Sequence, residues 1–118
     1  MAQLFQIHPQ NPQPRLISQA VRILRKGGIM AYPTDSSYAL GCHIGDARAL
    51  ERIRSIRQAG PDHNFTLVCA DLSELAKYAR VDNQEYRLLK HFTPGPYTFI
   101  LPATRDVPRR LQHPHRKR

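Results

Sequence analysis

An apolar run, a hydroxyl-rich turn and a second apolar run follow one another within residues 26–42, KGGIMAYPTDSSYALGC. The first run, residues 29–32, is typical of a buried strand, because a glycine pair precedes it and a proline stops it. Residues 34–38 then place five hydrogen-bonding side chains directly after that strand. Ligands of open α/β sheets bind at the carboxyl ends of strands, so the turn is a candidate site. An ordinary turn, in which Asp35 and the hydroxyls satisfy nearby backbone amides, explains the same residues.

Helices and strands alternate along the rest of the chain. Helices are predicted where apolar residues recur every three or four positions, and strands where short apolar runs follow turns. The predicted helices are residues 14–26 with Gly27 as the stop, 46–57, a short helix beginning at 71, and 82–92; the predicted strands are residues 29–32, 65–69 and 97–101. This order predicts an α/β fold in which helices pack on a twisted sheet.

Acidic residues mark the starts of three of these helices. Asp46, Asp71 and Asp82 are the expected N-caps, because a short carboxylate accepts hydrogen bonds from the first backbone amides. Glu74 and Glu85 follow three residues after their caps, which is the spacing of a capping box. The helix starts are therefore better defined by the sequence than the strands.

The chain is strongly basic, with 18 Lys and Arg against 9 Asp and Glu, a net charge of +9 and a pI near 10.3. Such a balance favours a polyanionic partner or an anionic substrate. Arg48, Arg52 and Arg54 fall on the second predicted helix, and residues 105–118 carry six basic residues against one acidic. Two interpretations stay open for both regions, a phosphate-binding surface and an ordinary solvated charge run.

Several classes of protein are excluded by what the sequence does not contain. No apolar run reaches membrane-spanning length and no signal peptide opens the chain, so a single-domain, cytoplasmic protein is expected. Cys42 and Cys69 are not spaced as a metal or redox pair, and buried free thiols are expected. No metal site, Ser-His-Asp arrangement or Walker motif is predicted.

Two motifs resemble signatures of the YrdC/YciO family, whose better known members are threonylcarbamoyl-AMP synthases. Residues 33–41, PTDSSYALG, resemble the family's Pro-Thr-Asp/Glu-Thr turn and the Tyr-Gly-Leu-Gly-like run after it. Residues 94–101, PGPYTFIL, resemble its Pro-Gly-Pro-x-Thr strand. An arginine-rich helix and an Asn-x-x-Leu strand lie between them, as in the family. The opening FQIHPQNPQPRLISQA is most similar to the YciO branch.

The resemblance implies a fold and a domain organisation. It implies a YrdC-like twisted sheet with packed helices over residues 1–104, followed by a basic tail over residues 105–118. In the family the domain continues past the position of Arg118. The expectation is therefore that the C-terminal part of the domain is missing from this chain, and that strands pairing with it would become exposed edges.

The resemblance also assigns site residues, by motif. Ser36 falls where a family threonine contacts the threonine substrate, Cys69 replaces a histidine near the amino acid, and Ala59 replaces an arginine that grips phosphate. The substrate-binding residues implied are Thr34, Ser36, Tyr38 and Cys69; the nucleotide-binding residues are Arg57, Asn64 and Thr98; and the nucleic-acid-binding residues expected from charge are Arg48, Arg52, Arg54, Arg109 and Arg110. No catalytic side chain and no metal ligand are assigned.

The function implied is that of a nucleotide- and double-stranded RNA- or tRNA-binding protein related to L-threonylcarbamoyladenylate synthase. ATP is the expected substrate, accompanied by Mg²⁺, with no tightly bound cofactor. Ala59, Cys69 and the missing part of the domain argue against a competent synthase. An active ATP-dependent synthase, a module that binds RNA by charge alone and a non-functional fragment remain as alternatives, so enzymatic activity stays an open question.

Overall fold

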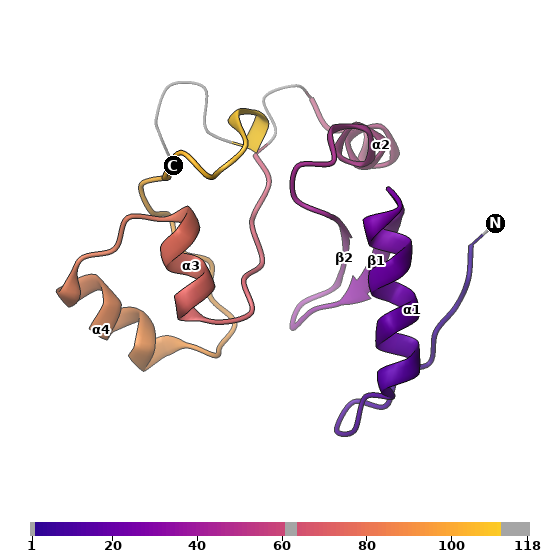
Figure 1. Cartoon of the computed structure of the whole chain (residues 1–118), viewed down its shortest axis with the longest axis horizontal. Coiled ribbons are helices and arrows are strands. Elements are labelled where there is room, and N and C mark those ends of the chain that lie inside the picture. Colours follow the sequence, from indigo (N-terminus) through magenta and orange to yellow (C-terminus); the bar gives the residue numbers. More distant parts are fainter. Residues whose placement is uncertain (1, 61–63, 112–118) are drawn as a thin grey trace. The chain divides into compact units, whose positions relative to one another are not determined.

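The computed structural model describes residues 2–60 and 64–111. The chain forms two compact units, residues 1–59 (unit 1) and residues 60–118 (unit 2). Unit 1 contains α1 (Pro14–Arg25), β1 (Ile29–Pro33), β2 (Tyr38–Cys42) and α2 (Ala47–Arg57) (Figure 1). Unit 2 contains α3 (Leu72–Tyr78), α4 (Asn83–Phe92) and a 3₁₀ turn, η1 (Arg109–Leu111). The predicted α/β fold class is confirmed, and no helix in the described ranges is long and apolar enough to cross a membrane.

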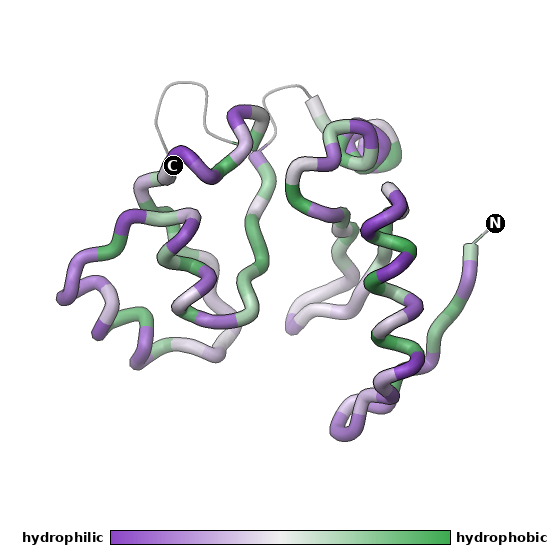
Figure 2. The backbone as a smooth tube through the Cα atoms, viewed as in Figure 1, coloured by the Kyte–Doolittle hydropathy of each residue, from purple (hydrophilic) through white to green (hydrophobic). Residues whose placement is uncertain are grey.

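Helix α1 ends as predicted, at a glycine pair. Gly27 adopts a positive φ of 91°, its N–H donates to Leu24 O at 3.1 Å, and the Gly28 N–H donates to Ile23 O at 2.9 Å. These two bonds form a Schellman motif, which satisfies carbonyls that the helix end leaves unpaired. Hydrophobic and hydrophilic residues alternate along α1 (Figure 2), and its apolar side chains are half-buried or partly exposed rather than fully buried. The helix therefore lies on β1 as an amphipathic cover.

Strands β1 and β2 form an antiparallel hairpin, in register from Ile29 opposite Cys42 to Pro33 opposite Tyr38. The predicted strand at residues 29–32 is confirmed. The hydroxyl-rich turn follows the carboxyl end of β1 as predicted, and it is a hairpin loop because the second apolar run pairs back on the first. The ring of Tyr32 lies over Gly41, where an added Cβ would come within 3.0 Å of Tyr32 Cε1. A side chain at position 41 would therefore displace that ring.

Helix α2 carries the core of unit 1. The Ala49 N–H donates to Asp46 Oδ1 at 3.0 Å, which confirms the predicted N-cap. The buried side chains of the helix are Ala49, Leu50 and Ile53. Its carboxyl end is a second Schellman motif, in which Gln58 takes a left-handed conformation with φ of 55°. A residue with a Cβ is strained there, because its side chain crowds the following carbonyl.

Replacing Gln58 with glycine is expected to stabilise unit 1. Glycine has no Cβ to crowd the backbone at a positive φ, so Gln58→Gly should raise the free energy of unfolding by about 1 kcal/mol. Urea denaturation followed by far-UV circular dichroism measures this change. Gln58→Ala serves as the control, since alanine keeps the Cβ and should bring no gain; a Gln58→Gly protein no more stable than the alanine variant would contradict the strain.

The helix starts of unit 2 also follow the prediction. The Glu85 N–H donates to Asp82 Oδ1 at 2.7 Å and the Asp82 N–H donates to Glu85 Oε2 at 3.0 Å, which is a complete capping box. At α3 the Glu74 N–H donates to Asp71 Oδ1 at 2.8 Å. The Glu74 carboxylate, however, accepts from the Ala70 N–H at 2.9 Å rather than from the cap residue itself. Both helices thus begin where their acidic residues place them.

The strands predicted at residues 65–69 and 97–101 are wrong. Neither segment forms a strand, and among the described residues of unit 2 the pairing recorded is a single bridge between Ala79 and Ala103. Around that bridge the Arg80 N–H donates to Pro102 O at 2.8 Å and the Thr104 N–H donates to Tyr78 O at 3.0 Å. Pro102 has no N–H to donate, which hinders a ladder from running back into residues 97–101. A strand is defined by its partner, and these apolar runs have none that forms a ladder.

Candidate functional site

Hydrogen bonds of Thr34 stabilise the hairpin loop of unit 1. The Thr34 Oγ1 accepts from the Ser37 N–H at 3.1 Å and donates to the Ser37 carbonyl, which also accepts from the Thr34 N–H at 2.7 Å. The hydroxyl of Thr34 is therefore engaged inside the loop. Ser36 is exposed and Tyr38 is 75% exposed, and within the described ranges neither side chain makes a recorded hydrogen bond. Of the three loop residues assigned by the resemblance, Thr34, Ser36 and Tyr38, the last two have exposed side chains that the loop does not engage by a recorded hydrogen bond.

The predicted arginine set of α2 divides into two groups. Arg48 and Arg52 are exposed and, being four residues apart, lie on one helix face. The side chain of Arg54 is only 13% exposed, and its Nε lies 3.4 Å from Glu51 Oε1. Arg57 is exposed at the last residue of the helix. A phosphate backbone approaching α2 would therefore first contact Arg48 and Arg52.

The basic residues near the end of the chain are only partly described. Arg109 is exposed in η1, whereas the side chain of Arg110 and all of residues 112–118 lie outside the described part. Val107, which belongs to the segment predicted as a basic tail, is 7% exposed, and Leu111 is half-buried. The beginning of that segment thus packs into unit 2.

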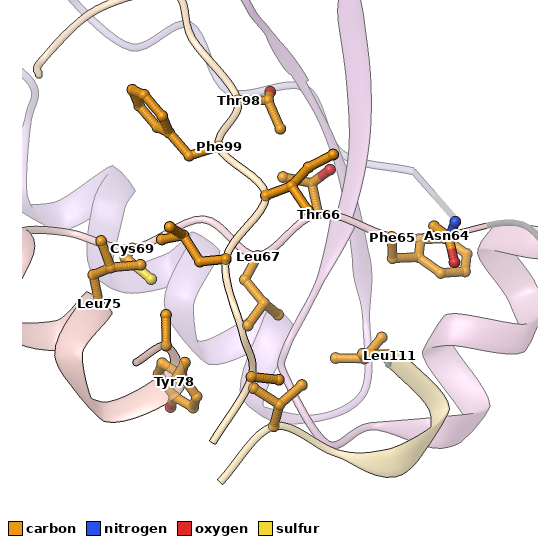
Figure 3. A pocket seen from close by; sticks show the side chains of 15 residues that line it. Asn64, Phe65, Thr66, Leu67, Cys69, Leu75, Tyr78, Thr98, Phe99 and Leu111 are labelled. Atoms are coloured by element: carbon orange, nitrogen blue, oxygen red, sulfur yellow. The ribbon is translucent and has the colours of Figure 1, made fainter. Parts of the chain in front are cut away.

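Unit 2 contains a cavity of about 320 Å³ that gathers three of the predicted site residues (Figure 3). Asn64 and Cys69 line it from one segment, and Thr98 lines it from a segment about 30 residues further along the chain. The remaining lining is apolar apart from Thr66 and Tyr78, and consists of Phe65, Leu67, Leu75, Ala79, Phe99, Ile100, Leu101, Ala103, Val107 and Leu111. Among the described residues, no charged side chain lines the cavity, so this lining offers hydrogen bonds and apolar contact but no charge to neutralise phosphate.

Sequence reasoning missed part of this lining. Thr66 lies in the run 64–67, every residue of which lines the cavity, so alternation along the chain does not single it out. Leu75 and Tyr78 from α3 are ordinary apolar helix residues, and nothing in the sequence distinguishes them from core positions. The cavity therefore depends on a helix that no motif pointed to.

The two cysteines are free thiols, and the surroundings of each raise its pKa. Burial, and secondarily the Glu74 and Asp71 carboxylates, raise the pKa of the Cys69 thiol. Burial and Asp46 likewise raise the pKa of Cys42. Since the thiolate is the nucleophile, the raised pKa lowers the reactivity of both thiols. Both cysteines are half-buried rather than fully buried as expected.

The charge on Glu74 is expected to slow the alkylation of Cys69. In Glu74→Gln the amide oxygen can still accept from the Ala70 N–H, but the negative charge is removed, so the pKa of Cys69 should fall toward its usual value. The rate of alkylation by iodoacetamide at pH 8, followed by mass spectrometry, should then rise for Cys69. Cys42 in the same sample is the internal control, because its acidic neighbour is Asp46. Equal acceleration of both thiols would contradict the assignment.

The described residues contain no cluster of three or more His, Cys, Asp or Glu that could hold a metal ion. The described lining of the cavity includes no carboxylate either. Mg²⁺ prefers carboxylate and phosphate oxygens in octahedral geometry, and the described residues do not gather such a set.

Comparison with known proteins finds a matching family model and similar proteins of known structure. The family model Sua5_yciO_yrdC, described as telomere recombination, matches residues 22–118. YciO of Escherichia coli is 62% identical over 99% of this chain, and its crystal structure superposes with a TM-score of 0.91. A threonylcarbamoyl-AMP synthase of Chromobacterium violaceum is 40% identical over 92% of the chain. The structure of P. abyssi Sua5 complexed with L-threonine is 29% identical over 87% of the chain, with a TM-score of 0.79.

The match covers only part of each of these proteins. The chain spans 57% of E. coli YciO, 57% of the C. violaceum synthase and 31% of P. abyssi Sua5. The relatives of YciO type thus contain a homologous region of the same length together with further polypeptide.

Proposed function

Because the chain belongs to the Sua5/YciO/YrdC family, we propose that it binds nucleotide and double-stranded RNA or tRNA in a role related to tRNA threonylcarbamoyladenosine modification. The observation that carries the proposal is the 40% identity to a threonylcarbamoyl-AMP synthase over 92% of the chain. ATP, accompanied by Mg²⁺, is the proposed nucleotide. Threonine is the proposed second ligand, since a Sua5 protein 29% identical to this chain has been crystallised with L-threonine.

Each group of site residues has a distinct part in this proposal. The exposed side chains of Ser36 and Tyr38 offer hydroxyls to the amino acid, while Thr34 keeps the loop in shape. Asn64 and Thr98 offer an amide and a hydroxyl to the uncharged part of a nucleotide, beside the neutral thiol of Cys69. Arg57, exposed at the end of α2, is the proposed phosphate-binding residue, because a guanidinium offers charge and paired hydrogen bonds.

The same arrangement favours binding over catalysis. Adenylate formation requires cations placed around the triphosphate, where they stabilise the charge that develops in the transition state. Position 59 carries an alanine, and the part of the cavity lining that the structure describes is neutral. We therefore propose that this chain is not itself a competent synthase, although it derives from the same family. The competing proposal, an active ATP-dependent synthase, predicts pyrophosphate release.

A thermal melt combined with a pyrophosphate assay tests the proposal. ATP with threonine should raise Tm, since ligand at about 100 times Kd stabilises the folded state by about 2.7 kcal/mol. No pyrophosphate release that depends on ATP, bicarbonate and threonine is expected. Ser36→Ala should reduce the Tm shift, and Ser55→Ala, an exposed serine of α2, should leave it unchanged. A melt unaffected by ligand would refute nucleotide binding, whereas threonine-dependent pyrophosphate release would establish the active enzyme.

RNA binding is expected to depend on the exposed arginine pair of α2. Each phosphate contact by a basic side chain contributes about 0.9 to the slope of log K against log salt for a duplex. Arg48→Ala with Arg52→Ala should therefore weaken binding and lower the slope by about 2. Fluorescence anisotropy of labelled tRNA between about 50 and about 200 mM salt measures both. Arg87→Ala, an exposed arginine of α4, is the control, and an unchanged slope in the double variant would remove α2 from the interface.

A further inference from the structure

The outer surface of α1 is basic and carries no acidic side chain of its own. Arg15, Arg22 and Arg25 are all exposed. Arg22 follows Arg15 by seven residues and Arg25 follows Arg22 by three, so the three guanidinium groups extend from one side of the helix. Residues 1–34 contain no Asp or Glu. Within the described part of the chain, no ion pair is recorded for these three arginines, so their charge is available to an anionic partner.

An apolar edge borders this basic surface along the same helix. Ile17 is 41% exposed and Val21 is 38% exposed, and the two side chains are one helical turn apart. Arg25 lies one further turn along the same line. No residue of α1 is fully buried, although the helix is amphipathic (Figure 2). Contact with β1 therefore leaves part of the apolar side uncovered.

The basic surface and the apolar edge together favour a lipid bilayer over nucleic acid as the partner. The arginines alone would attract any polyanion, including the phosphate backbone of RNA. Ile17 and Val21 gain nothing from a phosphate backbone, but they fit the boundary between lipid headgroups and acyl chains. Helices that lie on membranes combine basic and apolar faces in this way, and their long basic side chains extend toward the headgroups.

We propose that α1 is a contact site for an anionic membrane surface, where Arg15, Arg22 and Arg25 bind lipid phosphates and Ile17 and Val21 enter the interface. Binding should be peripheral and reversible, because two partly exposed aliphatic side chains bury little area. None of these five residues belongs to the hairpin loop, to α2 or to the described lining of the cavity. The membrane contact therefore goes beyond nucleotide and RNA binding and does not depend on either.

Sedimentation with vesicles tests the contribution of charge. The full chain, without nucleotide or RNA, is mixed with vesicles of phosphatidylcholine that either contain or lack phosphatidylglycerol. We expect binding only where phosphatidylglycerol is present, and weaker binding at high salt. Arg22→Gln with Arg25→Gln should weaken binding by roughly 25-fold, because each basic side chain near an anionic surface contributes about fivefold. Arg80→Gln with Arg87→Gln removes the same charge from exposed positions of unit 2 and should leave binding nearly unchanged.

Fluorescence tests whether the apolar edge enters the interface. The chain contains no tryptophan, so Val21→Trp introduces a single indole at this edge. Its emission should shift to shorter wavelength when vesicles with phosphatidylglycerol are added, because the indole leaves water for the headgroup region. Leu88→Trp, at a 56% exposed position of α4, is the control and should not shift.

The outcomes separate a bilayer from its alternatives. Absence of vesicle binding by a chain that keeps its far-UV circular dichroism would overturn the proposal. Equal weakening by Arg80→Gln with Arg87→Gln would also overturn it, because net charge rather than α1 would then be responsible. Vesicle binding without a shift of the Val21→Trp emission would exclude entry of the apolar edge. Loss of tRNA binding in the α1 arginine variant, without any vesicle binding by the parent chain, would assign this surface to RNA. None of these results bears on the ATP melt, so the two proposals fail separately.

Discussion

Gly28→Ala is expected to lower the free energy of unfolding of unit 1 by about 3 kcal/mol, although it adds one methyl group. An added Cβ would lie 2.5 Å from Ile23 Cγ2 and 2.8 Å from Ile23 O. The side chain can rotate away, but the carbonyl oxygen is part of the helix and accepts the Gly28 N–H at 2.9 Å. Relief of the clash therefore breaks the bond that ends α1. Urea denaturation followed by far-UV circular dichroism measures the loss.

Gly60→Ala is the matched control for this variant. Nothing lies within 4 Å of a Cβ built at Gly60, so its free energy of unfolding should change by less than about 0.5 kcal/mol. Gly28 leads directly into β1 and the hairpin loop, so Gly28→Ala should also reduce the Tm shift produced by ATP with threonine. Equal stability of the two alanine variants would contradict the prediction, because it would show that the end of α1 adjusts to accept the added Cβ without loss of stability.

The sequence predicts best what depends on neighbouring residues. The caps at Asp46 and Asp82 and the stop at Gly27 form hydrogen bonds within five residues, so residue type and spacing are sufficient to locate them. The first strand, residues 29–32, was equally well bounded by glycine and proline. Its partner β2 was not foreseen as a hairpin strand, because YALGC was considered only as the continuation of a motif. A short polar loop between two apolar runs was the available signal.

Strands that need distant partners were predicted wrongly for a physical reason. FTLVC and YTFIL satisfy every local criterion for a strand, yet a ladder requires a neighbour that local pattern does not supply. The site shows the same limit. Asn64, Cys69 and Thr98 do meet at one cavity, but no local pattern shows that Thr34 uses its hydroxyl inside its own loop or that Arg54 lies against Glu51. These two interactions, of the Thr34 hydroxyl and of Arg54 with Glu51, depend on side-chain geometry rather than on residue type.

The positive charge of the chain is not spread over all the candidate site residues, which composition alone does not show. The net charge of +9 favours a polyanionic partner or an anionic substrate, whereas the described lining of the cavity is uncharged and exposed arginines lie elsewhere, for example on α2, α4 and η1. In the proposed function, hydrogen bonding to a small ligand and attraction of a polyanion by charge therefore fall to different residues. Salt should weaken RNA binding steeply while changing the response to an uncharged ligand far less.

Leu89→Ala is the second change expected to have a large effect, and it acts on unit 2. Leu89 is 3% exposed and is the buried residue of α4, so its truncation removes apolar contacts and leaves a void. The expected loss is about 3 kcal/mol, which for a unit of this size lowers Tm by roughly 10–20 °C. The backbone of Leu89 also accepts from Thr93 N–H at 2.9 Å and Thr93 Oγ1 at 2.8 Å. Those bonds remain in the variant, so the loss measures packing alone.

Leu88→Ala provides the comparison, because it makes the same chemical change one position earlier in the same helix. Leu88 is 56% exposed, and its truncation should alter the free energy of unfolding by less than about 0.5 kcal/mol. Differential scanning calorimetry of the two variants beside the parent chain gives the pair of Tm values. Hydrogen exchange locates the change, since amides of α4 should lose protection in Leu89→Ala while those of α2 keep it. Similar losses in both variants would mean that α4 packs through a different face, and the core of unit 2 would then have to be reassigned.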